Sequence, residues 1–134
     1  MGIFNNLFSS KNDSSDNEND KIQWNELVST ETLDEIVEVS QKQTVAIFKH
    51  STRCIISSRV LKRFEQNYDL NNQVKMYFLD LLKHRDISNQ IASRFMVHHE
   101  SPQLIVIKKG KVIYHASHNE IQTEKLSEII AKLG

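Results

Sequence analysis

Residues 44–57 read TVAIFKHSTRCIIS, and this stretch decides the fold. Its first part, 44–49, is a run of β-branched and aromatic residues with the length of a strand. A predicted helix over residues 57–68 starts at the last residue of this stretch and has apolar side chains on one face. These are Val60, Leu61, Phe64 and Tyr68. The sequence therefore predicts a strand, a short polar loop and a helix, with Cys54 at the junction.

The same patterns continue on both sides of this unit. Further strands are predicted at 73–82, 104–107 and 112–114, the last two forming a hairpin with Gly110 in its turn. Further helices are predicted at 33–39 after the capping residues 29–32, at 86–96 with Asp86 as its cap, and at 121–133 with Leu126, Ile129, Ile130 and Leu133 inward.

This order of elements indicates an α/β domain. A strand–helix–strand unit requires parallel strands, and the hairpin adds an antiparallel pair. We therefore expect a four-stranded mixed sheet with helices on both faces. That is the element order of the thioredoxin fold.

The composition changes sharply near the N-terminus. Residues 9–20, SSKNDSSDNEND, hold no large apolar residue and carry a net charge of −3, which leaves +3 on the remainder. Such a stretch cannot offset its ordering entropy, so we expect a flexible polar tail over 1–20 and one domain over 21–134. The apolar tip at 3–8 is either a frayed end or a docking segment.

Composition excludes several classes of function. The 134 residues balance 17 basic against 17 acidic side chains, which argues against a nucleic-acid binder. Apolar runs are too short for a membrane span, and the N-terminus lacks the features of a secretory signal. A single cysteine cannot form an internal disulfide. We therefore expect a cytoplasmic protein without nucleic-acid or membrane partners.

Cys54 stands where a thiol becomes reactive. The N-terminus of the following helix stabilises a thiolate, and Lys49, His50 and Arg53 add positive potential. The alternative is a buried cysteine that only fills space, because free cysteine is among the most buried residue types. The polar and basic flanks favour the reactive interpretation.

Ser57 occupies the second cysteine position of a Cys-x-x-Cys motif. A redox-active Cys54 must therefore use one thiol: it attacks a mixed disulfide, takes over a small thiol and is released by a second small thiol. Ser57 either hydrogen-bonds the thiolate or caps the helix start, and the two roles are compatible.

The only proline, Pro102, lies in the segment HHESPQ just before a predicted strand. A peptide bond to proline can adopt the cis form. In a thioredoxin fold this loop faces the cysteine, and its backbone around Ser101 can pair with a substrate main chain. The alternative is an ordinary proline at the entry of a strand.

Two weaker signals complete the set. Arg85, Asp86 and Ser88 form a polar cluster at a helix start, which is either a cap or an anion contact. The six histidines include no set of three or four with the spacing of a zinc site, so we expect no metal.

Three motifs together carry a family resemblance. They are KHS-x-x-C-x-I-S at 49–57, R-D-x-S at 85–88 followed by Ile91-Ala92, and HESPQ at 99–103. They resemble the YtxJ-type bacillithiol system proteins, monothiol bacilliredoxins with a thioredoxin-like fold, over about residues 22–133. That family usually has proline directly after the cysteine, where this chain has Ile55, and threonine is common at the place of Arg53.

The resemblance implies a thiol–disulfide oxidoreductase. It would exchange thiols with bacillithiol, an anionic low-molecular-weight thiol, and remove it from mixed disulfides on cytosolic proteins. Bacillithiol is then a co-substrate, no cofactor is bound, and the partners are bacillithiolated proteins. Catalysis is assigned to Cys54, Ser57 and Pro102. Substrate binding is assigned to Lys49, His50, Ser51, Arg53, Arg85 and Ser101.

Two other functions stay open. Thioredoxin folds also serve as non-catalytic binding modules, which the missing second cysteine and the apolar tip favour. A cluster or metal carrier would use Cys54 with an external thiol and would resemble monothiol glutaredoxins.

Overall fold

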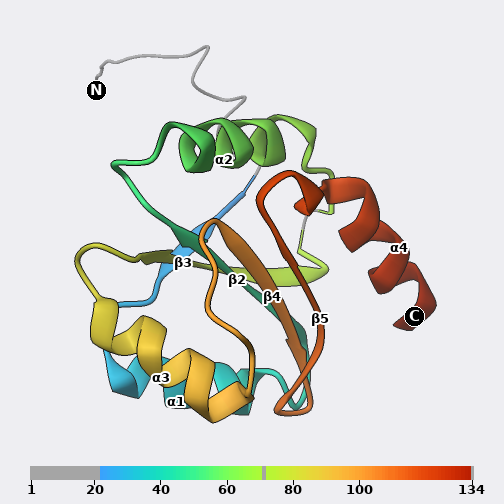
Figure 1. Cartoon of the computed structure of the whole chain (residues 1–134). Coiled ribbons are helices and arrows are strands. Elements are labelled where there is room, and N and C mark those ends of the chain that lie inside the picture. The colour runs from blue at the N-terminus through green and yellow to red at the C-terminus, as the bar shows by residue number, and fades with distance from the viewer. Residues whose placement is uncertain (1–21, 71, 134) are drawn as a thin grey trace, which may run out of the picture.

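The computed structural model describes residues 22–70 and 72–133. Figure 1 shows the elements in chain order. They are β1 (Trp24–Glu26), α1 (Thr30–Val39), β2 (Thr44–His50), α2 (Ile55–Asn67), β3 (Val74–Asp80), α3 (Arg85–Phe95), β4 (Gln103–Lys108), β5 (Lys111–Ser117), the short 3₁₀-helix η3 (His118–Glu120) and α4 (Thr123–Leu133). From α1 to α4, the predicted order of helices and strands is confirmed.

The strands form one mixed sheet in the order β1-β3-β2-β4-β5. β1 and β2 run parallel to β3, whereas β4 is antiparallel to both β2 and β5. β2 is the central strand, and all seven of its residues are buried. A strand paired on both edges and covered on both faces reads as a continuous apolar run, which is the pattern of residues 44–48.

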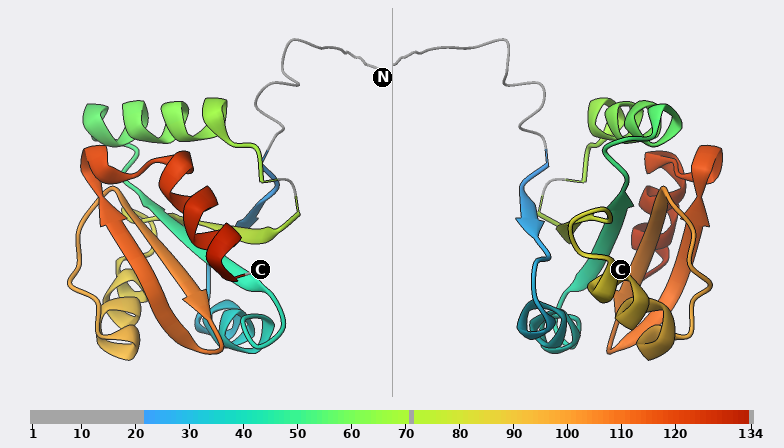
Figure 2. Two further views of the ribbon diagram at one scale, coloured as in Figure 1. Left: turned by 90° about the vertical axis from the view of Figure 1, so that its right-hand side faces the viewer. Right: turned by 60° about the vertical axis from the view of Figure 1, so that its left-hand side comes forward.

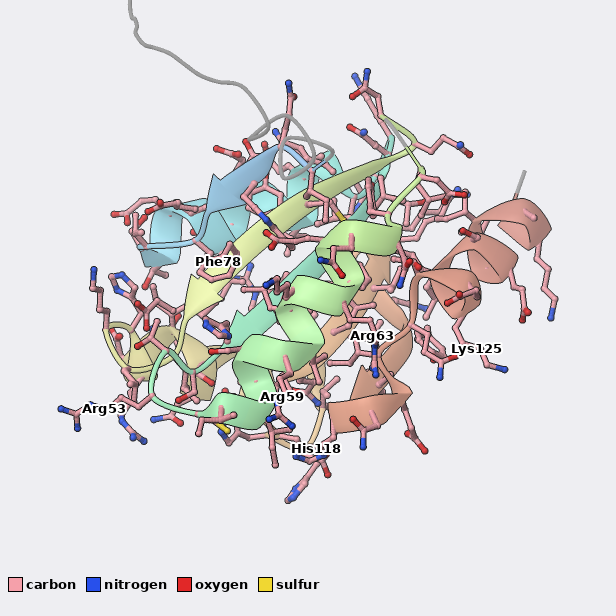
Figure 3. The ribbon with its side chains drawn as sticks, turned by 90° about the horizontal axis from the view of Figure 1, so that it is seen from above. Arg53, Arg59, Arg63, Phe78, His118 and Lys125 are labelled. Carbon is pink, nitrogen blue, oxygen red and sulfur yellow. The ribbon has the colours of Figure 1, made fainter. Side chains whose placement is uncertain are left out.

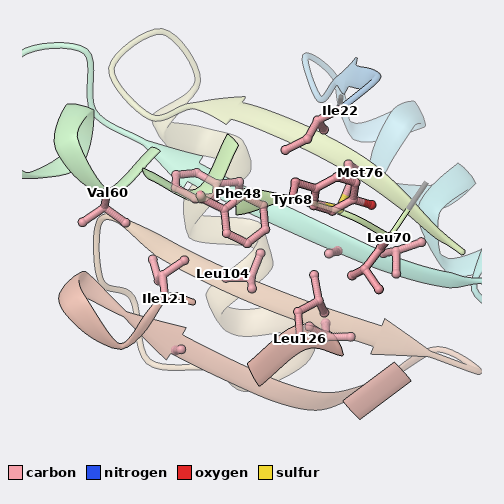
Figure 4. Packing of buried hydrophobic residues seen from close by; sticks show 14 residues of the cluster. Ile22, Phe48, Val60, Tyr68, Leu70, Met76, Leu104, Ile121 and Leu126 are labelled. Carbon is pink, nitrogen blue, oxygen red and sulfur yellow. The ribbon is translucent and has the colours of Figure 1, made fainter. Parts of the chain in front are cut away.

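Helices cover both faces of the sheet, as predicted (Figure 2). One core contains Val60 and Phe64 of α2 and Leu126 of α4, packed against the β2 side chains Ala46 and Phe48. Figure 4 shows Phe48 among the side chains of this core, with Tyr68 and Leu104 close by. The other core contains residues of α1 and α3, packed against the alternate positions of β2. Successive side chains of β2 therefore point to different layers.

Within the described residues, the sheet has five strands, not the four predicted. The additional strand, β1, pairs with β3 at the edge of the sheet, with Trp24 opposite Met76. The Trp24 ring packs edge-on against Phe48 and Phe78, and its Nε1–H donates to Glu65 at 2.8 Å. Three residues are too few to show an alternating pattern, so tertiary packing alone defines this strand.

Three local predictions also need correction. α3 begins at Arg85, so Asp86 lies within its first turn and the N-cap is His84, whose side chain makes no capping hydrogen bond. Leu133, predicted to face inward, is 39% exposed. α4 begins at Thr123 rather than at residue 121. Helix ends are poorly specified by periodicity, which accounts for these differences. The predicted tail over 1–20 lies outside the described residues.

Candidate active site

The cysteine lies at the end of the central strand, where the chain turns into α2. Because α2 begins at Ile55, Cys54 takes the N-cap position, with an extended backbone at φ −105° and ψ 120°. Its carbonyl accepts the first helical hydrogen bond from Ser58 N–H at 3.0 Å, and its own N–H donates to the Ser51 carbonyl at 3.1 Å. The thiol is free and partly exposed. The predicted strand–loop–helix junction is confirmed.

The start of α2 is open. No side chain caps it, and its first turn contains no acidic residue. The first N–H groups of a helix lack intrahelical acceptors, and the helix dipole adds a partial positive charge there. An anionic sulfur at Cys54 is therefore stabilised by the backbone itself.

Ser57 is fully buried and holds the loop that carries the cysteine. Its hydroxyl accepts a hydrogen bond from Ser51 N–H at 3.1 Å, and it lies 2.7 Å from His50 Nδ1. Burial lowers the pKa of His50, against the opposing charges of Asp80 and Glu65. This shift favours the neutral form of the imidazole. The contact between Ser57 and the thiolate stays a prediction.

Lys49 points away from α2, into the layer formed by α3. Its ammonium is fully buried, 2.8 Å from His99 Nδ1 and 3.4 Å from the Ser88 hydroxyl. Burial lowers the pKa of Lys49 to about 8, although the charge of Glu100 opposes this shift. Burial and the charges of Lys49 and Arg85 also lower the pKa of His99. Lys49, predicted to contact substrate, thus lies against His99, and the charge of Arg85, also predicted to contact substrate, acts on the same ring.

The loop before β4 contains the proline. The Ser101–Pro102 peptide bond is cis, as anticipated. The buried amide of Gln103 supports this loop by donating to the His98 carbonyl at 2.9 Å and accepting from Glu100 N–H at 3.4 Å. The Ser101 hydroxyl is buried, and it has no hydrogen-bond partner among the residues that the structure describes.

The support by Gln103 was missed at the level of sequence. A glutamine next to a proline at the first position of an apolar strand is the signal that marks it. A buried amide must satisfy its donors and its acceptor, and the nearest polar atoms are those of the loop backbone.

The surface beside the thiol combines apolar and basic side chains. Ile55 and Ile56 are 72% and 55% exposed, although they are large apolar residues. A groove of about 250 Å³ is lined by residues 52–55 together with Ser58, Arg59 and Lys62. Arg53, predicted to lie near the thiol, is among these lining residues. Figure 3 shows Arg53 and Arg59 projecting near the end of the molecule where α2 begins.

Within residues 22–70 and 72–133, no group of three or more histidine, cysteine, aspartate or glutamate side chains is placed to hold a metal ion. In the same part of the chain, no helix has the length and hydropathy needed to cross a membrane.

Comparison with known proteins agrees with this geometry. The family model described as "Monothiol bacilliredoxin BrxC" matches residues 25–126. A solved structure described as a candidate oxidoreductase with a thioredoxin fold is 27% identical, with a TM-score of 0.69, covering 78% of this chain and 91% of that one.

Thioredoxins share the fold at lower identity. The thioredoxin of Malassezia sympodialis is 16% identical with a TM-score of 0.62, covering 80% of this chain and 87% of that one. The thioredoxin of Fasciola hepatica is 18% identical with a TM-score of 0.59, covering 80% and 96%.

Proposed function

Because this chain belongs to the monothiol bacilliredoxin family, we propose that it removes bacillithiol from mixed disulfides on other proteins, with Cys54 as the nucleophile. The family match and the 27% identical relative support a thiol–disulfide redox function in general. The identity of the small thiol and of the protein substrates is the finer part of the proposal. One observation carries it: a single, partly exposed thiol at an open helix start.

The proposed reaction has two exchange steps. The Cys54 thiolate attacks the bacillithiol sulfur of a mixed disulfide, and the substrate protein leaves as a thiolate that takes up a proton. The thiolate of a second bacillithiol then attacks the bacillithiol sulfur on Cys54. Bacillithiol disulfide leaves, and the Cys54 thiolate is regenerated. The external thiol is required because the chain contains one cysteine.

The helix start and the proline loop have separate parts in this proposal. The open N-terminus of α2 stabilises Cys54 both as attacking thiolate and as leaving group. The backbone of the cis-proline loop around Ser101 pairs, in this proposal, with the main chain of the substrate. A chemistry that needs a free thiol suits a reducing compartment, and we therefore place the protein in the cytosol.

Mass spectrometry tests the proposal directly. A bacillithiolated protein is mixed with the wild type and, in parallel, with Cys54→Ala. We expect the wild type to gain bacillithiol on Cys54 while the substrate loses it, and the variant to do neither. The absence of both changes in the wild type would overturn the proposal.

A non-catalytic binding module is the second candidate. The exposed isoleucines Ile55 and Ile56 favour it, because adjacent large apolar side chains at a surface suit protein contact. In that case Cys54→Ala retains a protein partner with unchanged affinity, and Cys54 reacts slowly with alkylating agents. If the protein instead catalyses thiol exchange, Cys54 reacts rapidly with alkylating agents. Cys54→Ala then no longer forms a mixed disulfide with the substrate protein.

A further inference from the structure

The basic groove beside Cys54 holds cations without the ion pairs that two other cations of the described surface make. Its lining includes Arg53, Arg59 and Lys62 but no acidic residue. None of these three side chains forms a salt bridge with a described residue. By contrast, Arg94 lies 2.7 Å from Asp34 and Lys75 lies 3.9 Å from Glu35.

The spacing on α2 gives this groove its direction. Residues three or four apart share a helical face, so Ile55, Arg59 and Lys62 form a stripe that leads from the thiol along the helix. Arg63 points elsewhere, because its Nη2 donates to the carbonyls of Asn119 and Ile121 at 3.4 and 3.3 Å. Figure 3 shows Arg59 and Arg63 at successive places along α2. The cations of the groove, Arg59 and Lys62, therefore lie on the helical face that leads to the cysteine and have no ion pair with a described residue.

The size of the groove favours a small molecule. Its volume of about 250 Å³ lies just below the ~300–1,000 Å³ that is usual for pockets of drug-sized ligands. A folded protein would bind across a wider surface, whereas an anionic group attached to a sulfur at Cys54 fits in the groove itself.

We infer that this groove binds the anionic part of the small thiol, and that Arg59 and Lys62 thereby select an anionic thiol over a neutral one. The inference rests on the proposed function and adds the recognition site to it. The groove positions the small thiol while its sulfur forms or breaks the disulfide bond with Cys54. Ile55, the neighbour of Cys54 in the chain, supplies the large apolar side chain of the lining.

The experiment compares two probes, bacillithiol disulfide and the uncharged bis(2-hydroxyethyl) disulfide. The measured quantity is the ratio of their rate constants for modifying reduced Cys54. We expect R59A/K62A to lower the anionic-to-neutral ratio about three- to tenfold, the size expected for losing two exposed ionic contacts. We also expect added salt to lower the wild-type ratio, because exposed charges are screened.

The matched control is K42A/K132A. It removes the same two charges from exposed positions on other elements, so it reproduces the change in net charge. Its ratio should stay at the wild-type value. If both double variants lower the ratio equally, only net charge matters and the groove is not the binding site.

Two other outcomes are distinguishable. If wild-type Cys54 reacts with neither probe, the proposed function fails. If R59A/K62A keeps the wild-type ratio but slows transfer from a mixed-disulfide peptide rich in acidic residues, the groove recognises the protein substrate and the inference is overturned.

Discussion

The starts of α1 and α2 are built in opposite ways. At α1, the Ser29 hydroxyl accepts a hydrogen bond from Thr32 N–H at 3.2 Å, and Glu31 lies in the first turn. At α2, Cys54 takes the cap position without a side-chain bond, and the first turn has no acid. The serine of that turn, Ser57, bonds back to the preceding loop.

The capped start of α1 stabilises its own helix, whereas the open start of α2 can stabilise a reactive group. A capped helix start satisfies its own N–H groups, and a nearby acid balances its dipole. At an uncapped start, the free N–H groups and the helix dipole can instead stabilise an anion that lies beside them. In this chain that neighbour is a cysteine, so the stabilisation omitted from α2 is available to a thiolate.

The largest expected effect comes from Cys54→Ser. Thiol exchange should fall to the background rate, because the nucleophile is gone. Stability should stay equal or rise by about 0.5–1 kcal/mol, because serine is a preferred N-cap residue. Exchange assays and urea denaturation measure the two effects. Exchange at the wild-type rate would contradict the assignment of the nucleophile.

Ser57→Ala should break the link between α2 and its loop. The Ser51 N–H and the His50 ring lose their partner in a buried place, which costs about 1–3 kcal/mol of unfolding free energy. Urea denaturation measures the loss, and Ser58→Ala, at an exposed neighbour, serves as the control. Equal stability of the two variants would show that the buried bonds contribute nothing.

The start of α3 provides a third case, because Lys49 is buried beside its first turn. Burial lowers the pKa of Lys49 to about 8 in the folded protein, from an ordinary value of 10.5 that applies to the unfolded chain. Between these values the unfolded chain binds more protons, so unfolding free energy rises with pH. Relative to Lys49→Met, the wild type should gain about 2 kcal/mol between pH 7 and 9.5. Denaturation of both proteins at the two pH values tests this, and parallel curves would refute it.

Ser29→Ala removes the side-chain cap of α1, a feature that α2 does not have. We expect a loss of about 1 kcal/mol in unfolding free energy, because Thr32 N–H is left without its acceptor. The exchange rate should stay within about twofold of the wild type, since this cap lies at another helix. Thermal denaturation and the exchange assay measure the two responses. A large fall in exchange would indicate coupling between the two helix starts.

The smallest expected effect is that of Ile55→Pro. Cys54 already has the extended backbone that a residue before proline requires, and Ile55 occupies the first helical position. Proline should therefore raise stability by about 0.4–1 kcal/mol through the unfolded chain. A decrease in the melting temperature would show that the start of α2 cannot accept proline.

Local sequence was sufficient for the site's position along the chain. The β-branched run at 44–48, the polar loop and the apolar spacing after residue 57 placed Cys54 at a strand–helix junction. The sole proline before a strand marked Ser101–Pro102 as a bond that can be cis, and it is cis in the structure. The strand and helix patterns repeat over a few residues, and the proline is a local signal. Periodicity and turn chemistry therefore reveal these features.

Only the tertiary structure decided which side chains meet. Lys49 pairs with His99 across 50 residues, and the strand at Trp24–Glu26 exists because it packs against β3 and Phe48. Likewise, only the folded chain shows that the cations of the groove have no acidic partner among residues 22–70 and 72–133. Sequence patterns record local geometry, whereas these contacts depend on how distant segments share the two layers of the core.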